Sequence, residues 1–395
     1  MGSTAGLWDS RFDGTTSSKP SLIDQSNSRF IDDSGESVAF YKSRENDHDV
    51  DIGDILAATK SELPFIGPRF LTFDRRLGNG TSFQVNRELY TKPLEQPYYV
   101  AVKHLQPKSR AEHLKHLYAN VMRELRVLMH PPLKGHPCFI PAIGYGWTNQ
   151  PMADSRPYLI MDYSEQGTLD KYLTNISLLS RRQLRELALD VAVGIRELHR
   201  NGFIHGDVKS ENILVFESLS ADRPHVAKLA DFGAAFHRSD VEERGHRYLG
   251  TPRYNPPEMQ ESWKKVPFVP GPMEDAVAKI PELSTFESYK RADVYSFGLL
   301  LWEIMHKGRR FFDPAWANPG ETQLDCLRRM FENDTDELRR RLYDSFDQSL
   351  DSIDDLREEY LVLTVAEAFL ICVRDIPKLR PDMEEVVNVL SAGTK

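Results

Sequence analysis

The chain has 395 residues, of which 40% are hydrophobic and 28% charged, so it is a globular chain with room for one large or two ordinary domains. Its formal net charge of -9 argues against a nucleic-acid-binding surface spread over the whole protein. No apolar run reaches the length of about 18 residues that a membrane helix needs.

Residues 1–60 form the first distinct region, rich in Ser, Asp, Thr and Gly. Their apolar residues follow no period, so the segment buries too little surface to offset the entropy of ordering it. We expect an acidic, largely disordered extension that is dispensable for folding. It is either a plain solvated tail or a regulatory one.

A glycine-rich turn follows the extension. Gly78 and Gly80 stand between the apolar residues Leu77 and Val85, in a predicted hairpin. Glycines in such a turn let backbone N–H groups approach phosphate oxygens, although an ordinary hairpin has the same pattern.

The next strand and helix carry a candidate ion pair. Residues 98–103 predict a strand that ends on Lys103, a compact charge suited to phosphates. Apolar residues at helical spacing predict a helix over 110–129, which bears Glu112 and Glu124. We prefer Glu124 as the partner of Lys103, because apolar residues flank its face of the helix.

Strands at 140–147 and 158–163 and helices at 168–173 and 181–200 come next. The second helix is amphipathic and stops at an Asn-Gly pair. Its position predicts that it packs beneath the loop that follows.

Two polar loops then carry the candidate chemistry. Asp207, Lys209 and Asn212 lie between two apolar pairs that read as short strands. They supply one acid to take a proton, one cation to hold a phosphate and one amide oxygen to hold a metal. Asp231 opens an Asp-Phe-Gly turn after another strand, which can aim its carboxylate at a cation.

The remaining chain predicts a polar loop at 217–224, a Pro-rich insertion at about 260–285 and an apolar helix that opens at Ala292. Asp293, at the start of that helix, is placed to accept N–H bonds from the loop that carries Asp207.

In this order and spacing, the motifs resemble those of eukaryotic protein kinases, and in particular serine/threonine kinases of the tyrosine-kinase-like branch. The resemblance covers residues 65–392. It implies an α+β, bilobal protein kinase-like fold with a small antiparallel β lobe and one helix (65–161). A larger, mainly α-helical lobe (162–392) follows, interrupted by the insertion. For this lobe, the resemblance implies a buried ion pair between Glu258 and Arg380, which are far apart in the sequence.

The resemblance also implies ATP and Mg²⁺ as cofactors and a Ser or Thr hydroxyl of a protein as acceptor. Asp207 would accept the hydroxyl proton, and Lys209 would offset charge on the transferred group. Asn212 and Asp231 would hold Mg²⁺ through hard oxygen ligands.

The implied nucleotide site lies between the lobes. Met161 would gate the pocket behind the adenine, and backbone groups near Asp162 and Ser164 would bond its edge. The full set implied by the resemblance is Leu77, Gly78, Gly80, Val85, Ala101, Lys103, Glu124, Met161, Asp162, Ser164 and Leu214.

The chain departs from the family pattern at two positions. Phe83 replaces the third glycine of the phosphate loop, and Gly206 replaces the Arg that usually precedes the catalytic Asp. Because Gly206 has no charge, we expect activity without activation-segment phosphorylation read at that position. Candidate acceptors in the segment are Ser239, Tyr248 and Thr251, and candidate alternative readers of a phosphate are Arg238, Arg244 and Arg247.

Two alternative functions remain. A pseudokinase would keep the fold as an ATP-binding scaffold, and Phe83 and Gly206 motivate that hypothesis. A small-molecule kinase usually lacks the segment 251–258 that presents a peptide.

We expect no nucleic-acid partner and no membrane span, and the oligomeric state is left open. Three cysteines form no metal motif and indicate a reducing compartment, so we expect buried thiols. With no secretory signal at the N-terminus, this favours a cytoplasmic location, with the nucleus as the alternative.

Overall fold

The computed structural model describes residues 55, 59, 63–79, 83–105, 111–148, 156–175, 179–220, 222–244, 248, 250–259, 285–309, 320, 345 and 356–392, all within the structural unit 44–395. The extension up to residue 54, the insertion at 260–284 and Gly80 lie outside these residues.

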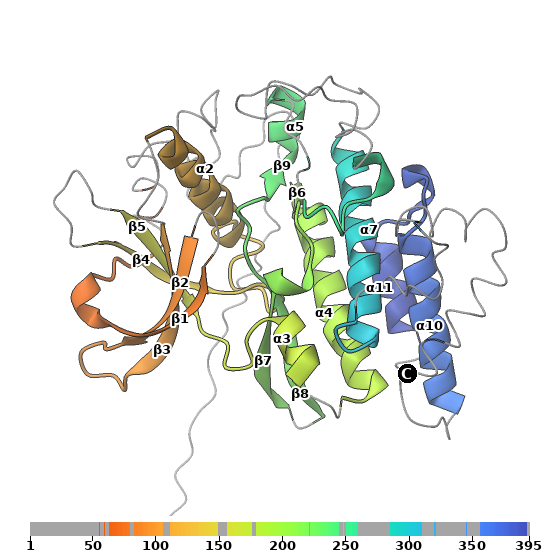
Figure 1. The fold of residues 1–395 in the computed structure, drawn as a ribbon, viewed down its shortest axis with the longest axis horizontal. Coiled ribbons are helices and arrows are strands. Elements are labelled where there is room, and N and C mark those ends of the chain that lie inside the picture. Colours follow the sequence, from red (N-terminus) through yellow and green to blue (C-terminus); the bar gives the residue numbers. More distant parts are fainter. Residues whose placement is uncertain are drawn as a thin grey trace, which may run out of the picture. The chain divides into compact units, whose positions relative to one another are not determined.

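A five-stranded antiparallel sheet forms the first part of the fold, in the order β1-β2-β3-β5-β4 (Figure 1). Cross-strand partners share a face of a sheet. Val85 pairs with Lys103, and Ala101 pairs with Met161, so these residues lie on one face. The strands are β1 (Leu71–Asn79), β2 (Phe83–Tyr90), β3 (Tyr98–Leu105), β4 (Ala142–Trp147) and β5 (Pro157–Asp162).

Helix α2 (Ala111–Leu128) accompanies this sheet (Figure 1), as its apolar period predicted. A cavity between the helix and the sheet reaches the Lys103 and Glu124 side chains. Val121 and Leu125 line it from the helix, and Leu159 lines it from β5. The helix is thereby packed with its glutamate facing the sheet.

Two residues before the expected domain boundary are buried. Ile55 and Thr59 are each 1% exposed, and both line the cavity between α2 and the sheet. The Leu63 N–H donates to the Thr59 carbonyl, and the Ile66 N–H donates to the Tyr145 carbonyl on β4. Packing against the domain therefore begins before residue 60, although the surrounding composition is polar.

We predict that Ile55→Ala lowers the free energy of unfolding by about 2–4 kcal/mol, because it removes a buried side chain and leaves a cavity. Deleting residues 1–60 should destabilise the protein for the same reason. Urea unfolding measures both effects, with Ile376→Ala as the control, because Ile376 is 56% exposed. A stability of Ile55→Ala equal to that of the control would contradict the packing described here.

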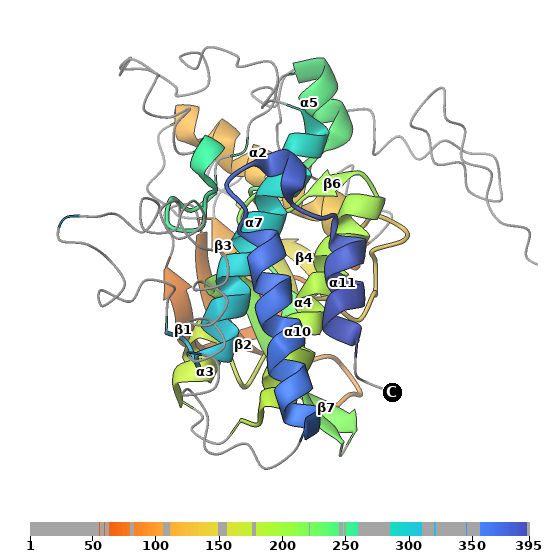
Figure 2. The same cartoon turned by 90° about the vertical axis from the view of Figure 1, so that its right-hand side faces the viewer.

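The second part of the fold is mainly helical. Helix α4 contacts α7, α10 and α11, which lie alongside it (Figure 2). Sheet β6–β9 and sheet β7–β8 have two strands each. The elements are α3 (Leu169–Asn175), α4 (Arg181–Arg200), β6 (Phe203–Ile204), η5 (Ser210–Asn212), β7 (Ile213–Ser220), β8 (Arg223–Leu229), β9 (Phe236–His237), α5 (Arg238–Arg244), α7 (Phe286–Met305), α10 (Leu356–Cys372), η6 (Pro377–Leu379) and α11 (Met383–Ser391), while η3 (Pro68–Phe70) precedes β1.

N-terminal capping residues mark where helices α4 and α7 begin. Helix α4 spans 181–200 as predicted, and a Ser180–Gln183 capping box begins it. Helix α7 begins at Phe286 rather than at Ala292, because Thr285 and Ser288 form the capping box there. Asp293 therefore lies inside the helix and not at its start.

The predicted polar loop at 217–224 is also wrong. Strands β7 and β8 pair through it, up to the contact between Ser220 and Arg223. The backbone of this hairpin is paired in the ladder while the polar side chains near its turn are mostly exposed, so their polarity reflects solvent contact and not a loop.

The α+β class is confirmed, with an antiparallel sheet and one accompanying helix followed by a helical part (Figure 1). Cys138 and Cys372 are buried free thiols, as expected, whereas Cys326 lies outside the described residues. Among the described helices, none combines the length and apolarity needed to cross a membrane.

Candidate active site

A buried lysine stands at the centre of the site. The Lys103 Nζ atom donates to Glu124 Oε2 at 2.7 Å and to Asp231 Oδ1 at 2.9 Å. Strand β3, helix α2 and the Asp-Phe-Gly turn each supply one of these residues. The side chain of Glu112 is outside the described residues, so Glu124 is the helix carboxylate that the structure places on Lys103.

Burial and charge act together on this trio. Burial alone would lower the pKa of Lys103, but the carboxylates of Asp231 and Glu124 outweigh it and hold the pKa above its ordinary value. The Lys103 charge in turn holds the pKa of Asp231 below its ordinary value. Burial raises the pKa of Glu124. The lysine is thus a fixed cation at neutral pH.

A second constellation forms on the loop after β6. The Thr251 hydroxyl donates to Asp207 Oδ1 at 2.6 Å, and Lys209 Nζ donates to Asp207 Oδ2 at 2.5 Å. Lys209 Nζ also donates to Thr251 Oγ1 at 3.0 Å. The amide of Asn212 donates to the Asp207 carbonyl at 2.9 Å and to its Oδ2 at 3.1 Å. One carboxylate therefore meets a hydroxyl, a cation and an amide.

Asp293 holds the start of this loop from helix α7. Its carboxylate accepts the backbone N–H groups of His205 at 2.8 Å and Gly206 at 3.1 Å, as expected from the sequence. It also accepts the Tyr248 hydroxyl at 3.1 Å. Tyr248 is 3% exposed, so its hydroxyl is committed to this contact rather than presented as a phosphate acceptor.

Backbone conformation fixes the second loop. Asp231 has a φ of 57°, a left-handed conformation that costs energy in a residue other than glycine. The Phe232 side chain is fully buried between the rings of Phe139 and His205. The buried ring anchors the turn and leaves the Asp231 carboxylate beside Lys103.

Gly206 occupies a position that admits no side chain. Its φ is 76°, and a Cβ placed on it would lie 2.5 Å from the Ala234 carbonyl oxygen. Backbone oxygen cannot give way as a flexible side chain can. The path of the segment after Asp231 therefore requires a glycine at position 206. An Arg, which the family usually has there, would not fit this backbone.

The residues expected around an adenine ring differ in their burial. Ala101 and Met161 are buried, whereas Leu77, Val85 and Leu214 are partly exposed. Gly78 pairs with Val85 across the β1–β2 hairpin.

The segment after β5 is fixed by its backbone and by one side chain. The Asp162 N–H donates to the Pro141 carbonyl at 3.3 Å. The Ser164 hydroxyl donates to the Val215 carbonyl and accepts the Gly167 N–H at 2.9 Å. These contacts hold the segment beside the start of β7.

The donor set fits a nucleotide with Mg²⁺. Asp231 has a side chain that is 54% exposed, and the Ala230 N–H donates to the Asn212 carbonyl, so the two loops are neighbours. Among the described residues, no group of three or more His, Cys, Asp or Glu could hold a metal alone. One carboxylate and one amide oxygen suit Mg²⁺, which takes its other ligands from phosphates and water.

Three buried pairs support the site from outside. The predicted Glu258–Arg380 pair is confirmed, with contacts of 2.6 and 2.8 Å. The sequence did not reveal the other two. Tyr254 donates to Glu303 at 2.6 Å, and Arg126 of α2 donates to both carboxylate oxygens of Asp240. Each joins residues far apart in the chain, so no local pattern signals it.

Because of two histidines near Arg126, His130 and His237, we expect the free energy of unfolding to fall in acid. Burial, then neighbouring positive charge, lowers the pKa of His130 and of His237 to about 4. Their neutral forms stabilise the fold above the unfolded pKa of about 6.5, and this contribution is lost as the pH falls towards 4. Between pH 7 and pH 5, the two together should cost about 4 kcal/mol.

Urea unfolding at pH 7, 6 and 5 measures this loss. In His130→Leu, the decrease in free energy of unfolding between pH 7 and pH 5 should be smaller by about 2 kcal/mol. An unchanged decrease would show that folding does not lower the pKa of His130.

Comparison with known proteins gives consistent matches. Residues 71–267 match the family model described as "Protein kinase domain". "Receptor-like kinase TMK4" of Arabidopsis thaliana is 29% identical over 59% of this chain and 22% of its own. "Serine/threonine-protein kinase ULK3" of Rattus norvegicus is 29% identical over 67% of this chain and 46% of its own. "Activin receptor type-1C" of Homo sapiens is 31% identical over 38% and 28%, so the chain spans less than half of each relative.

Proposed function

The chain carries a domain of the protein kinase family, and on this premise we propose that it transfers the γ-phosphoryl group of ATP to Ser or Thr hydroxyls of proteins. The proposal rests mainly on the contacts of the Thr251 hydroxyl. This hydroxyl donates to Asp207 at 2.6 Å and accepts a hydrogen bond from Lys209 at 3.0 Å. An aliphatic hydroxyl thus already occupies the position between base and cation that a substrate hydroxyl needs.

Asp207 is the proposed base. Its carboxylate orients the acceptor hydroxyl and accepts its proton as the bond from the hydroxyl oxygen to the γ-phosphorus forms. The bond between the γ-phosphorus and the β,γ-bridging oxygen breaks at the same time, and ADP leaves. Lys209 lies 2.5 Å from that carboxylate and is placed to offset negative charge on the transferred group. Catalysis by these residues is a matter of positioning and electrostatics.

Lys103 and the second loop are the proposed phosphate and metal site. Lys103, oriented by Glu124, would hold the α- and β-phosphates, and Asp231 with Asn212 would hold Mg²⁺. When bound, Mg²⁺ would supply positive charge to the phosphates. The adenine would lie against Leu77, Gly78, Gly80, Val85, Ala101, Met161 and Leu214, with its edge at Asp162 and Ser164.

We further propose that residues 65–392 form the catalytic domain, divided near residues 161 and 162 and interrupted by an insertion at about 260–285. The buried Ile55 and Thr59 add a short N-terminal flank to it. We place the protein in the cytoplasm, because its cysteines indicate a reducing compartment.

One observation favours the alternative, an ATP-binding scaffold without transfer. The Lys103 Nζ atom lies 4.4 Å from the centre of the Phe83 ring, at the position where the family has a small glycine. An aromatic ring over this cation restricts the space for phosphates. Binding of ATP without turnover in the wild type would favour the scaffold.

The acceptor class is tested with peptides that differ only in carrying Ser, Thr or Tyr at one position. We expect labelled phosphate from ATP in the Ser and Thr peptides. Thr251→Ala should lower the turnover by about tenfold or more, because Asp207 and Lys209 lose a shared partner. Thr251→Ser keeps the hydroxyl and should stay close to wild type. Preferential labelling of the Tyr peptide would overturn the assignment.

A further inference from the structure

Helix α2 and the segment after Asp231 are joined by a buried ion pair. The Arg126 Nη1 atom donates to Asp240 Oδ1 at 3.1 Å and to Oδ2 at 3.0 Å. Arg126 is 8% exposed and Asp240 is 3% exposed. Charged hydrogen bonds in such a dry setting are strong, and losing one partner leaves the other charge buried.

On its carboxylate side, the pair holds the base of helix α5. Asp240 Oδ2 also accepts the His237 N–H at 2.8 Å. His237 pairs with Phe203 in the β6–β9 sheet, and the Arg238 N–H donates to the Gly202 carbonyl at 2.8 Å. Asp240 thus anchors the strand that pairs with the stem of the Asp207 loop.

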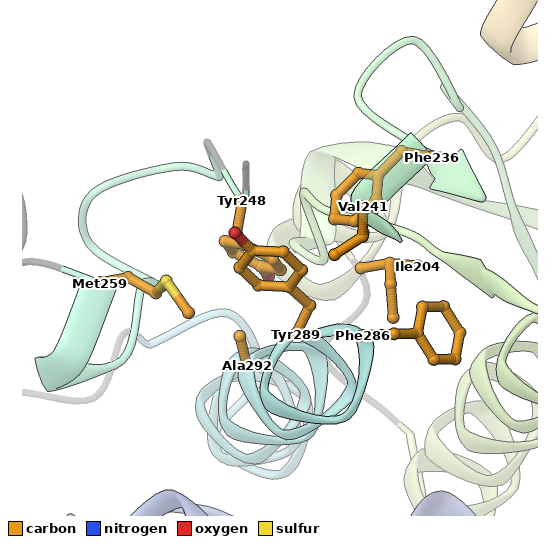
Figure 3. Packing of buried hydrophobic residues seen from close by; sticks show 8 residues of the cluster. All are labelled: Ile204, Phe236, Val241, Tyr248, Met259, Phe286, Tyr289 and Ala292. Carbon is orange, nitrogen blue, oxygen red and sulfur yellow. The ribbon is translucent and has the colours of Figure 1, made fainter. Parts of the chain in front are cut away.

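The segment after Asp231 packs against helix α7 through apolar side chains (Figure 3). Phe236 and Val241 pack in one buried cluster with Ile204 of β6 and with Phe286 and Tyr289 of α7. The cluster fixes the segment to the helical part of the fold. This cluster contains no residue of α2, whereas the Arg126–Asp240 pair joins the segment to that helix.

On its arginine side, the pair holds the helix that carries Glu124. Glu124 accepts from Lys103 at 2.7 Å, one half-turn from Arg126. Arg123 of the same helix donates to the Gly233 carbonyl at 3.3 Å. A shift of α2 away from the segment would therefore move Glu124 off Lys103.

We infer that the Arg126–Asp240 pair is a permanent tether that positions α2, and through Glu124 the Lys103 side chain, without any phosphorylation of the segment. Gly206 offers no cation there, and a Cβ at that position would meet the Ala234 carbonyl. The Asp240 carboxylate supplies the negative charge that a phosphate would otherwise bring, and Arg126 of α2 supplies the positive charge. This inference rests on the proposed function for its effect on rate, and Arg126 and Asp240 are positioning residues.

Among the cations that the sequence offered as readers of a phosphate, Arg238 has another contact. Its guanidinium lies 4.5 Å from the centre of the Phe286 ring. The Arg244 side chain and Arg247 are outside the described residues. Arg126 instead pairs with an anion of the segment, Asp240.

The test compares Asp240→Asn with Asp190→Asn in the full chain. Asp190 is a matched control, because it also accepts one backbone N–H, that of Ala227, and pairs with one arginine, Arg223, but it joins α4 to β8. Two readouts are taken at a temperature where each variant is folded: amide hydrogen exchange across α2, and kcat with the apparent KM for ATP.

For Asp240→Asn, exchange in α2 should accelerate about tenfold, and kcat should fall about tenfold or more. The KM for ATP should rise by a smaller factor than kcat falls, because the adenine contacts do not involve α2 and only the phosphate contact of Lys103 depends on it. Arg126→Lys keeps the charge but replaces the planar guanidinium by a differently shaped ammonium, and it should show the same changes to a smaller extent. It also decides the question if Asp240→Asn fails to fold.

Unchanged α2 exchange and kcat in these variants, or equal losses of kcat in Asp190→Asn, would overturn the tether. A wild type that transfers no phosphate would instead refute the proposed function, and the exchange readout would still decide on the tether.

Phosphatase treatment of the wild type is the second arm. Activity should stay within about twofold, because the tether needs no phosphate. A loss of about a hundredfold would show that a phosphate, and not Asp240, holds the segment.

Discussion

Replacing Asp231 by Asn is expected to abolish phosphoryl transfer while the protein stays folded. The substitution keeps the shape of the side chain but removes the charge that faces Lys103 and the proposed metal. Lys103 retains Glu124 at 2.7 Å, so no buried cation is left alone. Loss of a pre-placed charge at the reacting group typically costs about a hundredfold or more in rate.

Transfer from labelled ATP measures this effect, and thermal unfolding confirms that the variant is folded. Lys103→Met should be equally inactive but less stable, because it leaves the Glu124 carboxylate buried without its cation. Glu165→Gln serves as a control, since that side chain is 63% exposed. Normal turnover in folded Asp231→Asn would remove Asp231 from the metal site.

Replacing Arg380 by Ala is expected to lower the free energy of unfolding by about 3–5 kcal/mol, because it leaves Glu258 buried and unpaired. Arg380 is 2% exposed, and its two Nη atoms contact Glu258 at 2.6 and 2.8 Å. Its remaining N–H groups donate to backbone carbonyls, including that of Arg374 at 2.7 Å. The guanidinium also lies 4.9 Å from the centre of the Tyr295 ring.

Urea unfolding tests this prediction. Arg380→Lys should fall between wild type and Arg380→Ala, because an ammonium cannot reproduce the two parallel contacts. Arg182→Ala is the control: its pair with Glu186 lies on the surface and should matter little. If Arg380→Ala matched the control, the pair would not be a stabilising feature of the fold.

The order of the motifs in the sequence was enough to predict contacts between residues that are far apart in the chain. Lys103 and Glu124 meet at 2.7 Å, and Asp293 accepts N–H groups from the loop before Asp207. These residues belong to local patterns, such as a β-rich run, a helical period or an Asp-Phe-Gly turn; strand β3 runs two residues past Lys103, where the sequence predicted its end. Such patterns fix a local element, and the resemblance fixes how the elements meet.

Features without a local signal could not be predicted. Ile55 is a single buried apolar residue in a polar region, so no period reveals it. Arg126 and Asp240 are ordinary charges in their own elements, and their pairing depends on the path of the chain between them. Helix α7 was placed too late because its apolar run starts after its cap at Thr285.

Comparing wild type with Asp207→Asn tests directly whether the protein transfers phosphate to Ser or Thr. The two measurements are ATP binding and Mg²⁺-dependent transfer from labelled ATP to a Ser/Thr peptide mixture. Both proteins should bind ATP with similar affinity. Only the wild type should label the peptides, because Asp207 acts on the acceptor hydroxyl and not on the nucleotide. Wild type that binds ATP but labels no peptide, or Asp207→Asn that labels as fast as wild type, would contradict it.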